Sequence, residues 1–300
     1  LEEWPAAYEA FAAGAAARRG TLDYDEQAEI EMFQALERVY TRHWLDDGRT
    51  GYDDPSPIFV IGQPRTGTTL VERLLTRSGD VKPSEENYDF TLAFSSVINE
   101  QIAAHPGRGL SPLSAALEAD YGEIASRYLA SMRGMLGEAA MYLDKTPFNY
   151  LYCGLIRKAF PNARIIHVVR DPMDACYAIF KTLFSRAYFY SYDLEELAAY
   201  YVAYRELMDH WTRALPLPLL EVRYEDLVAD QDGENEYVIM ESKDPIMSPA
   251  WSPDSRRLAY VSFEGNKSSI WVQTLRTGNR IAVSKEPGIN GAPSFSPDGR

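Results

Sequence analysis

The segment from Pro57 to Thr69 constrains the fold of this chain more than any other. Residues Ile58 to Ile61 form an uninterrupted apolar run, typical of a buried strand, and an amphipathic stretch with helical spacing begins at Thr68. A glycine-flanked turn joins the two. A strand that leads into a helix through such a turn points backbone N–H groups and the positive end of the helix at one small volume. The sequence therefore predicts a site for a phosphate or sulfate ester.

The same turn departs from a nucleotide-binding P-loop at one position. The spacing from Gly62 to Gly67 matches the P-loop, but Thr68 stands where the motif requires lysine. In NTPases that lysine contacts the β- and γ-phosphates of a magnesium-bound triphosphate, whereas this turn offers Arg65 and two hydroxyl groups. We therefore expect an anionic ligand other than a nucleoside triphosphate. A P-loop nucleotide kinase or NTPase, which would depend on Mg²⁺, is the alternative enzyme class.

Charge and composition exclude several kinds of partner. The net charge of −14 argues against nucleic-acid binding, so an anionic ligand must be held by local positive groups. The apolar runs are shorter than the roughly 20 residues that a membrane helix needs, and no transmembrane segment is expected. Cys153 and Cys176 are expected to be buried free thiols, and the four histidines show no metal-ligand spacing. The sequence thus predicts no metal site.

Strand and helix patterns alternate from Pro57 to Leu227, which predicts an α/β fold with a P-loop-like parallel sheet flanked by helices. Two more buried strands are expected at 163–169 and 219–224. Between them, Asp174 should cap a helix that runs from Ala175 to Phe184. Asp193 should cap a second helix, with Glu196 completing a capping box. One apolar stripe runs along this helix, and core packing is the preferred interpretation over a ligand groove: Leu194, Leu197, Tyr201, Tyr204, Met208, Trp211 and Leu215.

The chain changes character after residue 231. Short β-type runs at 237–240, 258–261 and 270–273 replace the helices, and the segment from Pro249 to Arg256 recurs as Pro293 to Arg300. The repeat length, 295 − 251 = 44 residues, is that of one four-stranded propeller blade, and the repeated residues resemble TolB-like and WD40-like propeller repeats. We expect about one and a half blades at 234–300, an incomplete β-propeller-like segment. A junction between parts of two unrelated proteins near residue 232, both incomplete, is preferred over a truncated two-domain protein.

Two basic residues follow predicted strands and should lie near the turn. Arg170 comes directly after the strand at 163–169, and open α/β sheets bind ligands at the carboxyl ends of their strands. Its guanidinium suits a second phosphate, although a surface pair with Asp171 or Asp174 is the ordinary alternative. Lys145 follows a short predicted strand, where it would meet negative charge that develops on a leaving group. Taken alone, such a lysine is usually a solvated charge.

A pair of carboxylates is the third candidate feature. Glu85 and Glu86 lie beyond the helix that the turn opens, with Glu86 at 86 − 65 = 21 residues past Arg65. A carboxylate that returns to the edge of the crevice could accept the proton of an attacking hydroxyl group. An isolated Glu-Glu pair in a loop is otherwise a solvated surface feature.

These motifs, taken in order, resemble those of sulfotransferases. The resemblance covers roughly residues 50–231 and is greatest to the bacterial branch that is often fused to tetratricopeptide repeats and is related to protein-tyrosine sulfotransferases. We therefore divide the chain into a helical lead-in at 1–49, a sulfotransferase-like α/β domain at 50–231 that lacks its C-terminal lid, and the propeller-like segment. The motifs that carry the resemblance are Gln63 to Thr69, Asp144 to Pro147, Phe160 to Pro172 and Arg223 to Leu227.

The resemblance implies 3′-phosphoadenosine 5′-phosphosulfate as the sulfuryl donor, without a metal. Arg170 would hold the 3′-phosphate, Tyr224 falls on a position that contacts the adenine, and Lys145 would stabilise the bridging oxygen. Glu86 falls on the position of the catalytic base. The 5′-phosphosulfate would be held by the residues of the turn: Arg65, Thr66, Gly67, Thr68 and Thr69.

The acceptor and the compartment are left open by the sequence. A carbohydrate, a lipid, a phenol or a protein tyrosine could each supply the acceptor hydroxyl group. The propeller-like segment suggests a protein partner, and it supports a second alternative, a non-enzymatic propeller-type binding protein with an inactive sulfotransferase remnant. The compartment is not specified by the sequence, and the cytoplasm is preferred.

Overall fold

Two compact units make up the chain. The first spans Leu1–Asp232 and the second spans Gly233–Arg300. The structure is a computed structural model, and it describes residues 4–77, 79–84, 88–184, 187–217, 219–232, 246–252, 257–264, 268–274, 279–284 and 293.

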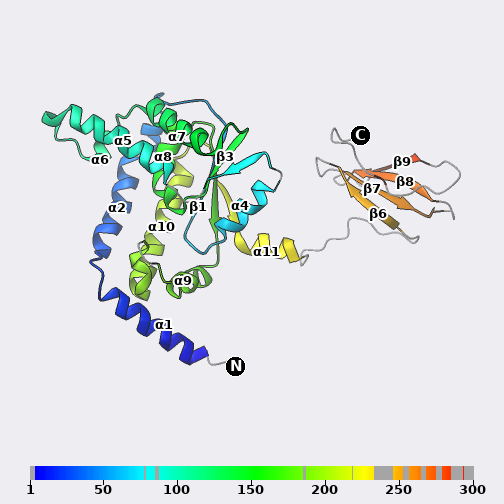
Figure 1. The fold of residues 1–300 in the computed structure, drawn as a ribbon, viewed down its shortest axis with the longest axis horizontal. Coiled ribbons are helices and arrows are strands. Elements are labelled where there is room, and N and C mark those ends of the chain that lie inside the picture. Colours follow the sequence, from blue (N-terminus) through cyan, green and yellow to red (C-terminus); the bar gives the residue numbers. More distant parts are fainter. Residues whose placement is uncertain are drawn as a thin grey trace. The chain divides into compact units, whose positions relative to one another are not determined.

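A parallel sheet forms the centre of the first unit (Figure 1). It has five strands in the order β2-β3-β1-β4-β5, and every neighbouring pair is parallel. This arrangement confirms the predicted α/β fold. It also places the apolar run after Pro57 at the middle of the sheet. The strands are β1 (Pro57–Gly62), β2 (Val81–Pro83), β3 (Met141–Asp144), β4 (Arg164–Val169) and β5 (Leu220–Arg223).

Helices cover both faces of this sheet, and shorter helices connect them. The α-helices are α1 (Trp4–Arg19), α2 (Glu26–Val39), α3 (Arg42–Leu45), α4 (Thr68–Thr76), α5 (Asp89–Ala104), α6 (Pro112–Ala116), α7 (Tyr121–Leu136), α8 (Cys153–Ala159), α9 (Pro172–Phe180), α10 (Leu194–Ala214) and α11 (Tyr224–Asp232). The 3₁₀-helices are η1 (Pro106–Arg108), η2 (Pro147–Tyr152) and η3 (Phe189–Tyr192).

Strand β1 contributes to a different core on each face of the sheet. Phe59 and Ile61 belong to the larger core, which includes residues of α2, α5, α7, α8 and α10. Ile58 and Val60 belong to a smaller core with Val71 of α4. Because successive side chains of a strand point to opposite faces, a strand buried on both faces must be apolar at every position. The unbroken apolar run of β1 meets this requirement.

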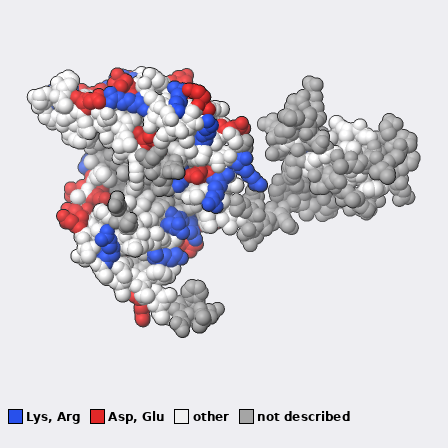
Figure 2. Space-filling model, viewed as in Figure 1, with Lys and Arg blue, Asp and Glu red and all other residues white. Residues whose placement is uncertain are grey.

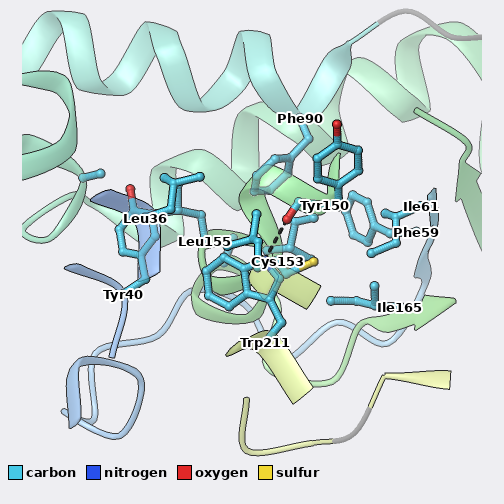
Figure 3. Close-up of a cluster of buried hydrophobic side chains, with 14 of the residues drawn as sticks. Leu36, Tyr40, Phe59, Ile61, Phe90, Tyr150, Cys153, Leu155, Ile165 and Trp211 are labelled. Atoms are coloured by element: carbon cyan, nitrogen blue, oxygen red, sulfur yellow. Dashed lines mark hydrogen bonds between the residues drawn. The ribbon is translucent and has the colours of Figure 1, made fainter. Parts of the chain in front are cut away.

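Trp211 is the largest side chain that is fully buried in the larger core (Figure 3). Its indole Nε1 donates a hydrogen bond to the carbonyl oxygen of Tyr150 at 2.8 Å. A Cβ atom placed on Gly154 of α8 would lie only 3.0 Å from two carbon atoms of the indole ring, Cη2 and Cζ3. The Trp211 side chain on α10 thus packs directly against the backbone of α8 and joins these two helices in the core.

The stripe predicted along α10 is confirmed as core packing, but its register is partly wrong. Leu197, Tyr204, Met208, Trp211 and Leu215 are buried as expected. Tyr200, Ala203 and Leu207 are buried too, whereas Leu194 is exposed and Tyr201 only partly buried, because the face of the helix that packs in the core passes through Tyr200 and not through Tyr201. Asp193 caps the helix, but the carboxylate of Glu196 pairs with Arg19 instead of closing a capping box.

Two further expectations about local structure are wrong. The strand predicted at 219–224 is not buried, because β5 is the edge of the sheet, and Leu220 is 59% exposed there. Helix α9 begins at Pro172 and ends at Phe180, and its N-cap is Asp171, not Asp174. Proline fits the first position of a helix because it needs no hydrogen-bond partner there.

The second unit contains an antiparallel sheet of four strands in sequence order. Ile281 and Val283 of the edge strand β9 are exposed. Most of the two repeat copies, and the β-type run at 237–240, lie outside the described residues. The strands are β6 (Ile246–Trp251), β7 (Arg257–Ser262), β8 (Ser269–Thr274) and β9 (Arg280–Ser284).

Three expected features can be compared with the described part of the chain. No helix there is both long enough and apolar enough to span a bilayer. No group of three or more His, Cys, Asp or Glu side chains in the described ranges could hold a metal ion. Both cysteines are free, but only Cys153 is buried, because Cys176 lies in the partly exposed part of α9.

Candidate functional site

The turn between β1 and α4 is shaped by its two glycines. Gly62 has a φ of 150°, and a Cβ atom there would lie 2.5 Å from the carbonyl oxygen of Val168 on β4. Gly67 has a φ of 102°, and a Cβ atom there would lie 2.5 Å from the ring of Tyr224. Side chains at these positions would be strained and would collide with their neighbours. The turn is therefore held close to both β4 and the start of α11.

The first turn of α4 leaves two backbone donors available. Within α4 the first hydrogen-bonded N–H groups are those of Leu70 and Val71, which donate to the carbonyl oxygen of Gly67 at 2.9 and 3.2 Å. No described residue accepts a hydrogen bond from the N–H groups of Thr68 or Thr69. Gly67, at the N-cap, has no side chain that could do so. Unsatisfied donors at the positive end of a helix form the kind of site that binds an anion.

The side chains of the turn have different environments. Arg65 is exposed and adopts a left-handed conformation with a φ of 66°, and Thr69 is exposed as well. Thr66 is buried, and its hydroxyl group donates to the carbonyl oxygen of Gln63 at 2.7 Å. The side chain of Gln63 is buried and accepts a hydrogen bond from the hydroxyl group of Tyr190 at 2.7 Å. The buried side chains of Thr66 and Gln63 therefore fix the turn on the side that faces the protein interior.

Arg170 lies against this turn. Its Nη1 donates to the carbonyl oxygen of Arg65 at 3.3 Å, and its Nη2 lies 3.4 Å from a carboxylate oxygen of Asp174. The guanidinium carbon is 4.7 Å from the centroid of the Tyr224 ring. Its Nε is buried and has no hydrogen-bond partner among the described residues. The structure thus brings together the turn, Arg170 and Tyr224, which come from the ends of three neighbouring strands.

Lys145 lies at the end of β3, on the other side of β1 from Arg170. Its side chain is only 10% exposed, and its Nζ lies 3.6 Å from a carboxylate oxygen of Glu72 on α4. The preceding residue, Asp144, accepts hydrogen bonds from the N–H group of Thr146 at 3.1 Å and from the side chain of Asn149 at 3.0 Å. These bonds fix the turn in which Lys145 stands. The ammonium group of Lys145 is therefore fixed near Glu72 and is not a freely solvated surface charge.

Asp144 itself is completely buried, and this has a consequence for pH dependence. Burial raises the pKa of its carboxyl group to about 6, with a smaller contribution from the nearby Asp89, although the hydrogen bonds to Thr146 and Asn149 oppose the shift. Since the pKa in the folded state exceeds the usual value of 3.8, the folded state holds the proton more tightly than the unfolded state. Stability is therefore lost as the pH rises from about 4 to about 6.

We expect Asp144→Asn to remove this pH dependence. Relative to Asp144→Asn, the wild-type chain should lose about 2–3 kcal/mol of unfolding free energy between pH 4 and pH 6.5, because two pKa units correspond to about that energy. Urea unfolding at a series of pH values measures the difference between the two proteins. A difference that stays constant over this range would show that Asp144 is ionised in the folded protein throughout.

One predicted site residue, Glu86, lies outside the described residues. Three residues that support the site were missed in the sequence: Gln63 and Tyr190, which hold the turn, and Glu72, the partner of Lys145. Glu72 stands four residues after Thr68 on the predicted helix, and this spacing was an available signal. No local pattern connects Tyr190 to Gln63.

Comparison with known proteins gives a separate match for each part of the chain. A model of the sulfotransferase family matches residues 57–240, and a model of the TolB beta propeller domain matches residues 219–300. An uncharacterized protein of Aquifex aeolicus is 30% identical over an alignment of 223 positions, which covers 70% of this chain and 28% of that protein. The Tol-Pal system protein TolB of Methylococcus capsulatus is 62% identical over 70 residues, which are 23% of this chain and 16% of TolB.

A solved structure is similar to most of this chain as well. The crystal structure of a sulfotransferase from Mycobacterium avium is 16% identical, with a TM-score of 0.34, and the match covers 74% of this chain and 80% of that one. In the two sequence comparisons above, the chain spans less than a third of the length of the Aquifex and Methylococcus relatives.

Proposed function

Because the chain belongs to the sulfotransferase family, we propose that its first unit binds 3′-phosphoadenosine 5′-phosphosulfate and transfers the sulfuryl group to a hydroxyl group of an acceptor. The observation that carries this proposal is the contact between Arg170, the β1–α4 turn and Tyr224 at the carboxyl ends of adjacent strands. Ligands of open α/β sheets bind at this edge. The donor, when bound, would supply an activated sulfuryl group.

The residues present suit a doubly anionic nucleotide. Thr68 and Thr69 offer N–H groups at the start of α4, and the absence of a side chain at Gly67 lets the ring of Tyr224 pack against the turn. Arg170 has a buried Nε that lacks a partner among the described residues, and a guanidinium matches the oxygens of a phosphate. We assign the 5′-phosphosulfate to Arg65, Thr66, Gly67, Thr68 and Thr69, the 3′-phosphate to Arg170 and a contact with adenine to Tyr224.

Two residues are assigned to the chemistry. Lys145 would stabilise the charge on the bridging oxygen, because it is a partly desolvated cation at the end of β3. Glu86 is proposed as the base that accepts the proton of the acceptor, on the resemblance alone. Transfer of a sulfuryl group resembles phosphoryl transfer, where positioning and charge stabilisation account for most of the catalysis. A sulfuryl group carries less charge than a γ-phosphoryl group, so we propose that no metal is needed.

The surface charge is consistent with a local and not a general anion site. Lys and Arg side chains are interspersed with Asp and Glu on the face seen in Figure 2. With a net charge of −14, the long-range field opposes the approach of an anion. The affinity must therefore come from the few groups that contact the ligand. Removing one of them should have a large effect.

We expect Arg170→Ala to weaken the binding of 3′-phosphoadenosine 5′-phosphate by roughly 2–5 kcal/mol, because a phosphate is left without its cation. Calorimetric titration of the full chain in the presence of a chelator measures this loss. Arg164→Ala is the matched control: Arg164 opens β4, whereas Arg170 follows its other end, and it should bind like the wild type. Equal binding by Arg170→Ala and the wild type would contradict the assignment of the 3′-phosphate.

A parallel titration with Mg²⁺-ATP, without the chelator, separates the alternatives. Tighter binding of Mg²⁺-ATP than of 3′-phosphoadenosine 5′-phosphate would favour a kinase or an NTPase. Binding of neither nucleotide would favour a binding protein whose activity lies in the second unit, with an inactive remnant of the family in the first.

For the rest of the chain we propose the division into a lead-in at 1–49, a catalytic domain at 50–231 and about one and a half propeller blades at 234–300. Support for the last part comes from the four-stranded antiparallel sheet and from the match to the TolB beta propeller domain. The exposed Ile281 and Val283 of β9 suit contact with a protein partner. The class of the acceptor is left open among carbohydrate, lipid, phenol and protein tyrosine.

A further inference from the structure

Glu225 makes one contact that the proposed assignments do not use. It stands in the first turn of α11, directly after Tyr224, and its Oε1 accepts a hydrogen bond from the backbone N–H group of Asp171 at 2.7 Å. This N–H group belongs to the peptide that joins Arg170 to Asp171. The other carboxylate oxygen of Glu225 is buried and has no hydrogen-bond partner among the described residues. A carboxylate of α11 therefore holds the backbone that carries Arg170.

The turn that carries Arg170 is fixed from both sides. On the C-terminal side, the carboxylate of Asp171 accepts hydrogen bonds from the N–H groups of Met173 and Asp174, which anchors the turn to α9. On the side of α11, the ring of Tyr224 lies under the guanidinium of Arg170 and Glu225 holds the next peptide. Two consecutive residues of α11 thus contact the end of β4: Tyr224 contacts the side chain of Arg170, and Glu225 accepts a hydrogen bond from the backbone that follows it.

The sign of the charge argues against a direct electrostatic role for Glu225. A carboxylate next to a site for an anion repels the ligand and offsets the field of the nearby arginine. If Glu225 acted only through its charge, it would weaken binding. Its acceptor oxygen, in contrast, satisfies a backbone donor and fixes the direction in which Arg170 leaves the strand.

We propose that Glu225 is a positioning residue for the donor site, which holds Arg170 in the direction of the 3′-phosphate through the N–H group of Asp171. This inference rests on the proposed function, since it assumes that Arg170 receives the 3′-phosphate. It concerns one phosphate only. Its effect should therefore be seen with a ligand that carries the 3′-phosphate and not with one that lacks it.

The test compares Glu225→Gln with Glu225→Met in the full chain. Both substitutions remove the charge and keep the length of the side chain, but only glutamine keeps an oxygen that can accept the hydrogen bond from Asp171. We expect Glu225→Gln to bind 3′-phosphoadenosine 5′-phosphate at least as tightly as the wild type, and Glu225→Met to bind it roughly 10-fold more weakly. Adenosine 5′-phosphate, which lacks the 3′-phosphate, should bind all three proteins within about 2-fold.

Asp226→Ala is the matched control, because it removes the same charge from the neighbouring, exposed position. It should bind both nucleotides like the wild type. Calorimetry without metal measures all affinities. Thermal unfolding shows whether each variant is folded. If Glu225→Met does not fold, Glu225→Ala is used in its place. Equal affinities of the glutamine and methionine variants, or an equal loss for both nucleotides, would overturn the inference. A wild-type chain that does not bind 3′-phosphoadenosine 5′-phosphate would instead overturn the proposed function.

Discussion

Lys145→Met should lower the rate of sulfuryl transfer by roughly 10²–10³-fold, the usual loss when one preorganised stabilising group is removed from a site of developing charge. Methionine keeps most of the buried stem of the lysine but not its charge. The affinity for 3′-phosphoadenosine 5′-phosphate should change far less, because the charge that Lys145 stabilises is greatest in the transition state. The partner carboxylate of Glu72 is 22% exposed and can stay solvated in the variant.

The rate is best followed as the formation of 3′-phosphoadenosine 5′-phosphate from the donor. This readout does not depend on which acceptor is used, so it can be recorded with a panel that includes 4-nitrophenol, a tyrosine peptide and a monosaccharide. Lys145→Arg keeps the charge and should retain part of the rate. An unchanged rate in Lys145→Met, or a loss of nucleotide affinity as large as the loss of rate, would exclude the proposed role of Lys145 on the leaving group.

Trp211→Ala should lower the unfolding free energy of the first unit by about 3–5 kcal/mol, the range observed when a buried aromatic side chain is truncated. The indole packs against the backbone of Gly154 and donates a hydrogen bond to Tyr150, so truncation leaves both a cavity and an unpaired carbonyl oxygen (Figure 3). A loss of this size is a large part of the total stability of a typical domain.

Urea unfolding followed by circular dichroism at 222 nm measures this effect, because the described helices all belong to the first unit. The control is Val202→Ala on the same helix. Val202 is 56% exposed, and its truncation should change the stability by less than about 0.5 kcal/mol. Similar losses in the two variants would mean that Trp211 does not pack in the core in solution.

The parts of the fold that could be predicted from the sequence are those set by local patterns. The apolar run of β1, the glycines at its end and the helical spacing after Thr68 are each specified within a few residues, and the structure has them where they were expected. The position of Arg170 beside the turn follows from its place after a strand, because ligand-binding residues of parallel sheets gather at one edge.

The rest depends on contacts between distant segments. An apolar run shows that a strand can be buried but not whether it becomes an edge, and for this reason the exposure of β5 was missed. The bond between Glu225 and Asp171 joins residues 54 positions apart, and the one between Tyr190 and Gln63 joins residues 127 positions apart. No periodicity or capping rule relates such pairs, so these supports of the site become visible only when the sheet is assembled.

The strand order also sets the spacing between the two strands that lead to Lys145 and Arg170. Lys145 and Arg170 follow β3 and β4, which lie on either side of β1. Neighbouring strands are about 4.8 Å apart, so the two strands that precede these cations are separated by roughly 10 Å. The two positive charges proposed for the site are thus supplied by separate connections of the sheet, one after β3 and one after β4. A substitution at one of these two positions can therefore leave the backbone that carries the other cation in place.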